Sequence, residues 1–204
     1  MKVGFNMTKT KKTDLRAIAV TAIMGALGTV LMVLEFSLPI IPSFIKLDFS
    51  ELPALIASFA YGPLYGIMVC FIKNLIHIFF GSTMCIGEIS NFILGAIFVG
   101  IAGFVYKKNK TKKRALISCI IGAVAMAVVS VFTNYFVVYP LYVKVLGMPM
   151  EAILGMYQVI LPSVDNLWEA LLIFNLPFNV VKGILDAVIC FVVYKRISPV
   201  LKKC

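Results

Sequence analysis

Residues 15–36 have the sequence LRAIAVTAIMGALGTVLMVLEF, an apolar run that directly follows a basic segment. A transmembrane helix needs about 20 mainly apolar residues, so this run is long enough to cross a bilayer. It is too long for the apolar part of a signal peptide, and it lacks a clear small-residue cleavage site. We therefore expect a retained first membrane helix rather than a targeting segment.

The rest of the chain is as apolar as this run. Its 204 residues are 61% hydrophobic and only 14% charged, with a mean hydropathy of +1.01, whereas soluble domains are about 45–50% apolar. This composition excludes a soluble globular protein, and the length accommodates about six membrane helices with short connections. We expect an all-α integral membrane protein, a six-transmembrane-helix bundle that forms a single membrane domain over residues 1–204.

Prolines, glycines and polar turns divide the chain into helices. We expect helices at residues 15–36, from 51 to the Gly62-Pro63 break, at 64–80, from 88 to 106, at 115–142 and in the last apolar run. A loop at 37–50, a turn at 81–87 and a longer segment at 143–165 connect them. The last helix has two possible placements: Pro177 either kinks a helix over 167–194, or lies in the first turn of a shorter helix that follows another one near the outer surface.

The charges indicate an orientation. The chain has 19 Lys and Arg residues against 9 Asp and Glu, and most of the cations lie in residues 2–16, 107–114 and 195–203. Cytoplasmic segments of membrane proteins carry such an excess, and six crossings from a cytoplasmic N-terminus place all three segments inside. We expect residues 1–14 as a basic cytoplasmic segment, 15–196 as the bundle and 197–204 as a cytoplasmic tail. Nucleic-acid binding is not indicated, because the 107–114 loop is too short to form a binding platform.

Polar side chains within apolar runs are costly in a membrane, so they mark candidate functional positions. In the last run, four of them lie within about 60° of one helical face: Asn175, Asn179, Lys182 and Asp186. Two interpretations remain open. The stripe faces a ligand, or Lys182 and Asp186 neutralise each other while the asparagines bridge helices.

Further polar groups occur earlier in the chain: Lys73, Asn74 and His77; Glu88 and Asn91; Asn134 and Tyr135. We expect His77 to be a hydrogen-bonded structural residue, because no cysteine or carboxylate lies at ligand spacing from it. The five cysteines show no C-x-x-C spacing, and we assign no metal. The sequence contains neither a P-loop nor a nucleophile elbow. We therefore expect no enzyme, no catalytic residue and no ATPase motif of its own.

Small residues in the first apolar run include the pair Ala22-x-x-x-Ala26. Such a pair allows another helix to approach closely. That helix belongs either to a partner or to this chain.

Five stretches resemble one known family: KLDFSELP at 46–53, Gly62-Pro63-x-x-Gly66, KNLIH at 73–77, GE-x-x-NF at 87–92 and FNLPFN-x-x-KG at 174–183. Together they resemble the riboflavin-specific substrate-binding (S) component of energy-coupling factor (ECF) transporters over nearly the whole chain. The KLDF and NLPFN-x-x-K stretches are the more specific ones.

The resemblance implies how such a chain works. It implies a multi-pass protein of a prokaryotic plasma membrane that binds riboflavin near its outer face, as a transported substrate and without a cofactor. It also implies docking, through the Ala22 and Ala26 pair, on a transmembrane coupling protein with two ATPase subunits. The S component then reorients in the membrane and delivers the vitamin to the cytoplasm.

The resemblance also suggests ligand contacts. Carried over by position, Asn134, Asn179 and Lys182 correspond to contacts of the family. An Asn amide matches the alternating acceptors and N–H of the isoalloxazine edge, and Lys can donate to a carbonyl or ribityl oxygen. We expect Phe44 and Ile45 as a lid and Glu88 as an acceptor for ribityl hydroxyls. Asn91 and Asn175 complete the expected substrate-binding set.

Other functions are also compatible with part of these sequence features. An S component for another vitamin, such as pantothenate or folate, would keep the fold and change the pocket. A stand-alone secondary transporter usually shows internal repeats, and no convincing repeat relates the two halves of this chain. A proton-coupled carrier would need Lys73, Glu88 or Asp186 to titrate. A membrane enzyme is the candidate from another functional class.

Overall fold

The computed structural model describes the chain from residue 10 to 203 apart from Ser82, and side-chain environments from 15 to 193. The expected basic residues Lys2 and Lys9 lie outside the described part. The main helices are α1 (Thr10–Val33), α2 (Glu51–Tyr61), α3 (Pro63–His77), α4 (Ile86–Lys108), α5 (Lys112–Thr133) and α9 (Leu176–Lys203). Three shorter helices are α6 (Tyr139–Leu146), α7 (Met150–Gln158) and α8 (Leu167–Ala170), and two π-helical turns are η1 (Asn134–Val138) and η2 (Leu171–Asn175).

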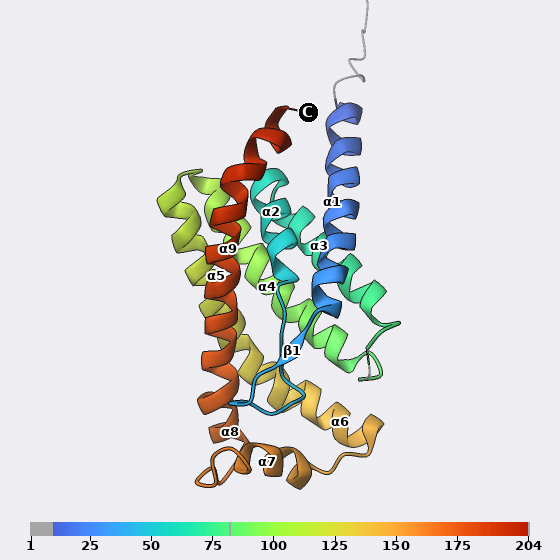
Figure 1. The fold of residues 1–204 in the computed structure, drawn as a ribbon, viewed down its shortest axis with the longest axis vertical. Coiled ribbons are helices and arrows are strands. Elements are labelled where there is room, and N and C mark those ends of the chain that lie inside the picture. Colours follow the sequence, from blue (N-terminus) through green and yellow to red (C-terminus); the bar gives the residue numbers. More distant parts are fainter. Residues whose placement is uncertain (1–9, 82, 204) are drawn as a thin grey trace, which may run out of the picture.

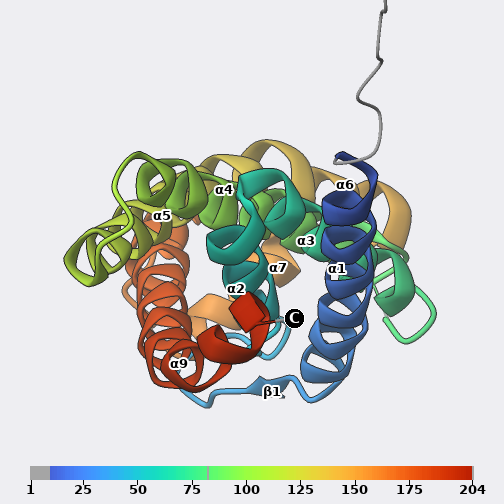
Figure 2. The ribbon, with the colours of Figure 1, turned by 90° about the horizontal axis from the view of Figure 1, so that it is seen from above.

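Helix α2 lies in the middle of the bundle, and α1, α3, α4, α5 and α9 surround it (Figure 2). It packs against α1, α3, α4 and α9. Every residue from 53 to 59 is buried, because an apolar helix in this position has neighbours on all sides. The start of α2 is therefore held in the interior, where its polar side chains can reach only protein groups.

The two ends of the bundle differ. The start of α1, the connection between α4 and α5 and the last turns of α9 lie at one end, which we call the basic end (Figure 1). Helices α6, α7 and α8 lie at the other, the α7 end. The described parts of the three basic segments thus gather at one end, as an orientation with all of them on one side of a membrane requires.

Among the described residues, four helical segments are long and apolar enough to cross a membrane: Leu15–Val33, Ile86–Lys108, Lys112–Leu146 and Leu167–Val193. The other two expected helices are short. Helix α3 has 15 residues and α2 has 11, whereas a span needs about 20. The Gly62-Pro63 break lies between them as expected, with Gly62 at a φ of +116° and Pro63 at the first position of α3.

The α1–α2 loop (residues 34–50) runs into α2 as extended chain (Figure 1). It contains an unexpected short hairpin, in which β1 (Phe36–Ser37) pairs antiparallel with β2 (Lys46–Leu47). Non-helical backbone at membrane depth is tolerated where protein surrounds it. The Asp48 side chain supplies such a partner within the loop, because its Oδ1 accepts from the Ser50 backbone N–H at 2.9 Å.

The region before the last helix contains more helix than expected from the sequence. Helix α6 continues the expected fifth helix to Leu146, and α7 lies within the segment at 143–165 that was expected only as a connection. The last helix follows the first of the two placements. It is continuous from α8 through η2 into α9, and Pro177 is the second residue of α9.

Each π-helical turn ends two residues before a proline. Pro140 is the second residue of α6 after η1, and Pro177 is the second residue of α9 after η2. Proline has no backbone N–H and its ring clashes with the carbonyl four residues earlier. A wider turn relieves this clash without ending the helix.

Close packing of α2 against α3 predicts a sensitive glycine. A Cβ at Gly66 would lie 2.8 Å from the Ala54 carbonyl oxygen and 2.6 Å from Ser58 Cβ. We expect Gly66→Ala to lower the free energy of unfolding by about 1–3 kcal/mol through overpacking, measured as a lower thermal unfolding midpoint in detergent. Gly155→Ala is the control, because no atom lies within 4 Å of its added Cβ. Equal midpoints for the two variants would contradict this packing.

Candidate ligand-binding site

A cavity of about 140 Å³ lies between the α1–α2 loop, the start of α2 and helices α4, α5 and α9. Seven of the eight expected substrate-binding residues line it: Phe44, Ile45, Asn91, Asn134, Asn175, Asn179 and Lys182. A second cavity of about 370 Å³ adjoins it and shares Phe44, Lys46 and Asn91 with it. The eighth residue, Glu88, lines this second cavity. Together the two spaces reach the size of a typical small-molecule site, about 300–1,000 Å³.

The two π-helical turns present asparagines to the cavity. Asn134 is the first residue of η1 and Asn175 the last residue of η2. Single π turns inside helices are frequent at functional sites, because they break the regular spacing of the side chains. The prolines that follow these turns therefore help to place both amides, although neither proline contributes a polar group.

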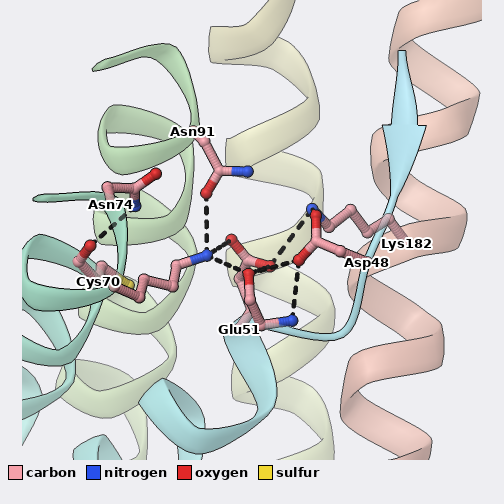
Figure 3. A network of polar contacts seen from close by, with 8 residues as sticks. Asp48, Glu51, Cys70, Asn74, Asn91 and Lys182 are labelled. Atoms are coloured by element: carbon pink, nitrogen blue, oxygen red, sulfur yellow. Dashed lines mark hydrogen bonds and ion pairs between the residues drawn. The ribbon is translucent and has the colours of Figure 1, made fainter. Parts of the chain in front are cut away.

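An ionic network (Figure 3) borders the cavity, which Glu51 and Lys182 line. Lys182 reaches from α9 and places its Nζ 2.8 Å from Asp48 Oδ2 and 3.3 Å from Glu51 Oε2. The suggested pairing of Lys182 with Asp186 is therefore not the one that forms. The loop carboxylate takes this place because the α1–α2 loop lies against α9, a contact that helical spacing within α9 does not reveal.

Lys73 provides the second cation of the network. It is completely buried on α3, and its Nζ lies 2.8 Å from Glu51 Oε1 and donates to Asn91 Oδ1 at 2.9 Å and to the Ser50 hydroxyl. Glu51 therefore bridges both lysines. Two cations and two carboxylates balance in charge, which is the condition for burying ions at tolerable cost.

The network also fixes the protonation of the loop carboxylate. Burial by itself raises the pKa of Asp48, but the charges of Lys182 and Lys73 outweigh burial and hold this pKa well below its usual range. Asp48 is therefore an anion at neutral pH, and its attraction to Lys182 persists across the physiological range.

Three of these network residues were missed as site residues. Asp48 and Glu51 lie in the KLDFSELP stretch and Lys73 in the KNLIH stretch, so the motifs contained the signal. What the sequence did not show is which cation meets which carboxylate.

Two tyrosines and an amide form a closed polar cluster at the α7 end of the cavity. The hydroxyls of Tyr139 and Tyr157 lie 2.5 Å apart, Tyr157 donates to Asn175 Oδ1 at 2.7 Å, and Asn175 Nδ2 donates back to Tyr139 at 3.3 Å. Phe44 from the α1–α2 loop packs edge-on against both rings, with centroid distances of 6.0 and 5.9 Å. The loop thus packs, through Phe44, against two aromatic rings at the edge of the cavity.

The cavity-facing amides have different free groups. Asn179 uses its Nδ2 to donate to Ser130 Oγ at 3.1 Å and to the Asn175 carbonyl at 2.8 Å, which leaves its Oδ1 as an acceptor for a ligand. The Asn134 side chain has no hydrogen bond to any described residue, so both ends of its amide are available. Lys182 has three donors and two carboxylate neighbours, which leaves one N–H for a ligand.

Glu88 is already engaged by protein groups. His77 Nδ1 lies 3.0 Å from its Oε1, and Thr83 Oγ1 donates to its Oε2 at 3.0 Å. His77 is thus a hydrogen-bonded residue, as expected. Among the described residues, no group of three or more His, Cys, Asp or Glu side chains is arranged to hold a metal ion.

The expected docking pair lies on the surface of the bundle. Ala22 and Ala26 are both exposed, whereas Gly25 and Gly28 on the same helix are buried. Ile72 of α3 packs at Gly25 and Lys73 at Gly28. Packing within the chain therefore uses the glycines and leaves the alanine pair open to lipid or to another protein.

Comparisons with known proteins agree with this architecture. Residues 16–194 match the family model described as "ECF transporter, substrate-specific component", which confirms the resemblance seen in the motifs. The riboflavin transporter RibU of Staphylococcus aureus (strain TCH60) is 31% identical over 182 residues, covering 89% of this chain and 90% of its own length. The riboflavin transporter FmnP of Bacillus subtilis (strain 168) is 30% identical, with coverages of 90% and 93%.

One solved structure has the same fold. It is described as "Structure and mechanism of the S component of a bacterial ECF transporter" and superimposes with a TM-score of 0.73 at 30% sequence identity. The match covers 93% of this chain and 99% of that one.

The geometry of the network predicts the effect of removing Lys73. Lys73→Met removes the buried ammonium that donates to Glu51 Oε1 and Asn91 Oδ1, and breaking a buried ion pair costs about 3–5 kcal/mol. We expect a correspondingly lower thermal stability of the purified protein. The matched control is Lys46→Met, which removes the partly exposed ion pair with Glu35 and should cost less than about 1 kcal/mol. A Lys73 variant as stable as the Lys46 variant would show that the network does not hold the helices together.

Proposed function

The chain belongs to the substrate-specific components of ECF transporters, and on that premise we propose that it is the riboflavin-binding subunit of a vitamin uptake transporter. In this proposal it takes riboflavin from outside the cell and delivers it by reorienting on a separate coupling module. The observation that carries the proposal is the cavity lined by Asn134, Asn179, Lys182 and aromatic rings.

The chemistry of the cavity suits a flavin. The pyrimidine-like edge of isoalloxazine alternates carbonyl acceptors with an N–H donor, and the free Asn134 amide offers the complementary donor and acceptor. The Asn179 oxygen accepts from an N–H, and the remaining Lys182 proton suits a carbonyl or a ribityl hydroxyl. Tyr139, Tyr142 and Phe178 supply the apolar walls that a planar ring system needs.

The second cavity suits the ribityl chain. Its lining combines Glu35, Lys46, His77, Thr83 and Glu88, and the polyol of riboflavin can exchange hydrogen bonds with such groups. Glu88 already accepts from Thr83 and lies beside His77. It can therefore accept one further hydrogen bond from the ribityl chain, but its carboxylate is not free of protein partners.

The position of the cavity supports entry from outside. Its lining includes residues of the α1–α2 loop, α6 and η2, which lie away from the basic end (Figure 1), and basic segments favour the cytoplasmic side. In the proposed orientation the α1–α2 loop covers the ligand, with Phe44 and Ile45 at the cavity. Release of the loop requires separation of Asp48 from Lys182, so the ion pair and the Phe44 contacts together act as its closure.

A separate module supplies the energy in this proposal, because the sequence contains no P-loop. The module consists of a transmembrane coupling protein and two ATPase subunits. The exposed Ala22 and Ala26 pair on α1 offers a surface of small side chains where a partner helix can approach closely. The surrounding exposed residues of α1, which include Ile18, Ile23 and Leu27, are apolar, so the same face can contact lipid when no partner is bound.

Direct binding tests the proposed substrate. We expect the purified protein to quench flavin fluorescence with one-to-one stoichiometry, and Lys182→Met and Asn179→Leu each to weaken binding about tenfold or more. A hydrogen bond to a charged group contributes about 1.5–3 kcal/mol, and 1.4 kcal/mol corresponds to a factor of about ten. Lys144→Met is the control, since Lys144 is exposed on α6 and lines neither cavity.

The outcomes of this titration separate the candidate substrates. No quenching at micromolar riboflavin by a folded wild-type protein would contradict riboflavin as the substrate. Pantothenate and folate would then be tested on the same preparation.

The α1–α2 loop predicts a kinetic effect. Phe44→Ala removes the edge-on contacts with Tyr139 and Tyr157, so the loop should open more often and riboflavin should dissociate faster. Stopped-flow displacement measures this rate, with an expected increase of about tenfold or more because such an aromatic truncation costs at least about 1.4 kcal/mol. Phe36→Ala is the matched control: it lies in the same loop, is 44% exposed and lines neither cavity. Equal dissociation rates in the two variants would exclude Phe44 as part of the closure.

A further inference from the structure

Asp186 on α9 differs from the other buried carboxylates. Its side chain has no solvent exposure, and neither of its oxygens has a hydrogen-bond partner among the described residues. By contrast, Asp48, Glu51 and Glu88 are all hydrogen-bonded or ion-paired. Buried polar groups in proteins almost always have partners, so an isolated carboxylate inside an apolar bundle requires an explanation.

The groups around Asp186 cannot balance a negative charge there. The titratable groups that face it come from α9 itself, from α5, α2 and α3 and from the α1–α2 loop: Lys182, Cys190, Cys119, Glu51, Lys73, Cys70 and Asp48. The three cysteines are neutral thiols. Both lysines are already paired, Lys182 with Asp48 and Glu51, and Lys73 with Glu51.

Charge balance then determines the state of Asp186. The charges of the four paired residues sum to zero: Lys73, Lys182, Asp48 and Glu51. An ionised Asp186 would therefore leave one uncompensated negative charge in the interior. Burying such an ion carries a desolvation penalty that relaxation does not remove, and a group in that position neutralises instead. The neutral form of a carboxyl group is its protonated acid.

We propose that Asp186 is a proton-binding site, which carries a proton while Lys182 is paired with Asp48 and releases it when Lys182 turns to Asp186. Lys182 and Asp186 are four residues apart on α9, so their Cβ atoms lie about 5–6 Å apart. The flexible lysine stem can therefore exchange one carboxylate partner for the other. Lys182 stays charged throughout, and the proton lost by the Asp186 carboxyl goes to water.

This exchange links a proton to the α1–α2 loop. When Lys182 leaves Asp48, the loop loses its ion pair to α9 and Asp186 gains a cation that stabilises its ionised form. Opening of the loop and loss of the proton therefore favour each other. The link depends only on this chain's own residues and does not require that riboflavin be the substrate.

Infrared spectroscopy of the full-length protein tests the proton site directly. The chain has only four aspartates, Asp14, Asp48, Asp165 and Asp186, so labelling them with ¹³C at the side-chain carboxyl marks few groups. At about pH 8, aspartates with ordinary pKa values near 3.9 are ionised. We expect one protonated-carboxyl band that shifts with the label and disappears in Asp186→Asn but persists in Asp165→Asn. Absence of a label-sensitive band in folded wild-type protein would overturn the proposal.

A labelling experiment tests the link to the loop. Ile41 in the α1–α2 loop is 7% exposed, so Ile41→Cys, in a protein with Cys85→Ser and Cys204→Ser, reports opening through its rate of reaction with a maleimide. The rate is compared with and without Asp186→Asn at each pH, which cancels the ionisation of the thiol itself. We expect equal rates at low pH and a several-fold faster reaction with Asp186 present at high pH. A ratio that stays constant across pH would overturn the proposed exchange of Lys182.

Discussion

The structure depends on Glu51, which joins two buried lysines from different helices. Its carboxylate lies within 2.8 Å of Lys73 Nζ on α3 and 3.3 Å of Lys182 Nζ on α9. In an apolar bundle none of these charges could remain buried alone, because an unpaired ion costs several kcal/mol. The start of α2, both lysine-bearing helices and the α1–α2 loop are therefore held at one point, and Glu51 and Lys182 line the cavity there.

The same constraint explains why the polar side chains gather where they do. Short α2 leaves non-helical chain inside the bundle, and backbone in that position needs protein partners. Asp48 supplies one by accepting from the Ser50 backbone N–H. The side chains of Asp48 and Ser50 also connect the loop to Lys182 and Lys73, respectively. The loop that borders the cavity and the network that stabilises the bundle thus share residues, so the position of the loop and the stability of the fold depend on the same contacts.

Lys182 has the largest number of possible roles among these residues. It holds the α1–α2 loop through Asp48, lines the cavity with one donor to spare, and lies one helical turn from the unpartnered Asp186. A lysine is suited to this position because its ammonium group is a compact charge with three donors on a flexible stem. Ligand binding, loop opening and proton release can consequently all involve the Lys182 side chain.

The sequence alone determined the membrane character, the main helix breaks and seven of the residues that line the cavity. Apolar run length, the Gly62-Pro63 break and the polar stripe from Asn175 to Lys182 are local properties, and local periodicity is visible in a chain without its fold. Only the tertiary structure decided the pairing of charges. Lys182 meets Asp48, 134 residues away in the chain, rather than Asp186 four residues away, because the choice among carboxylates depends on which helices lie side by side.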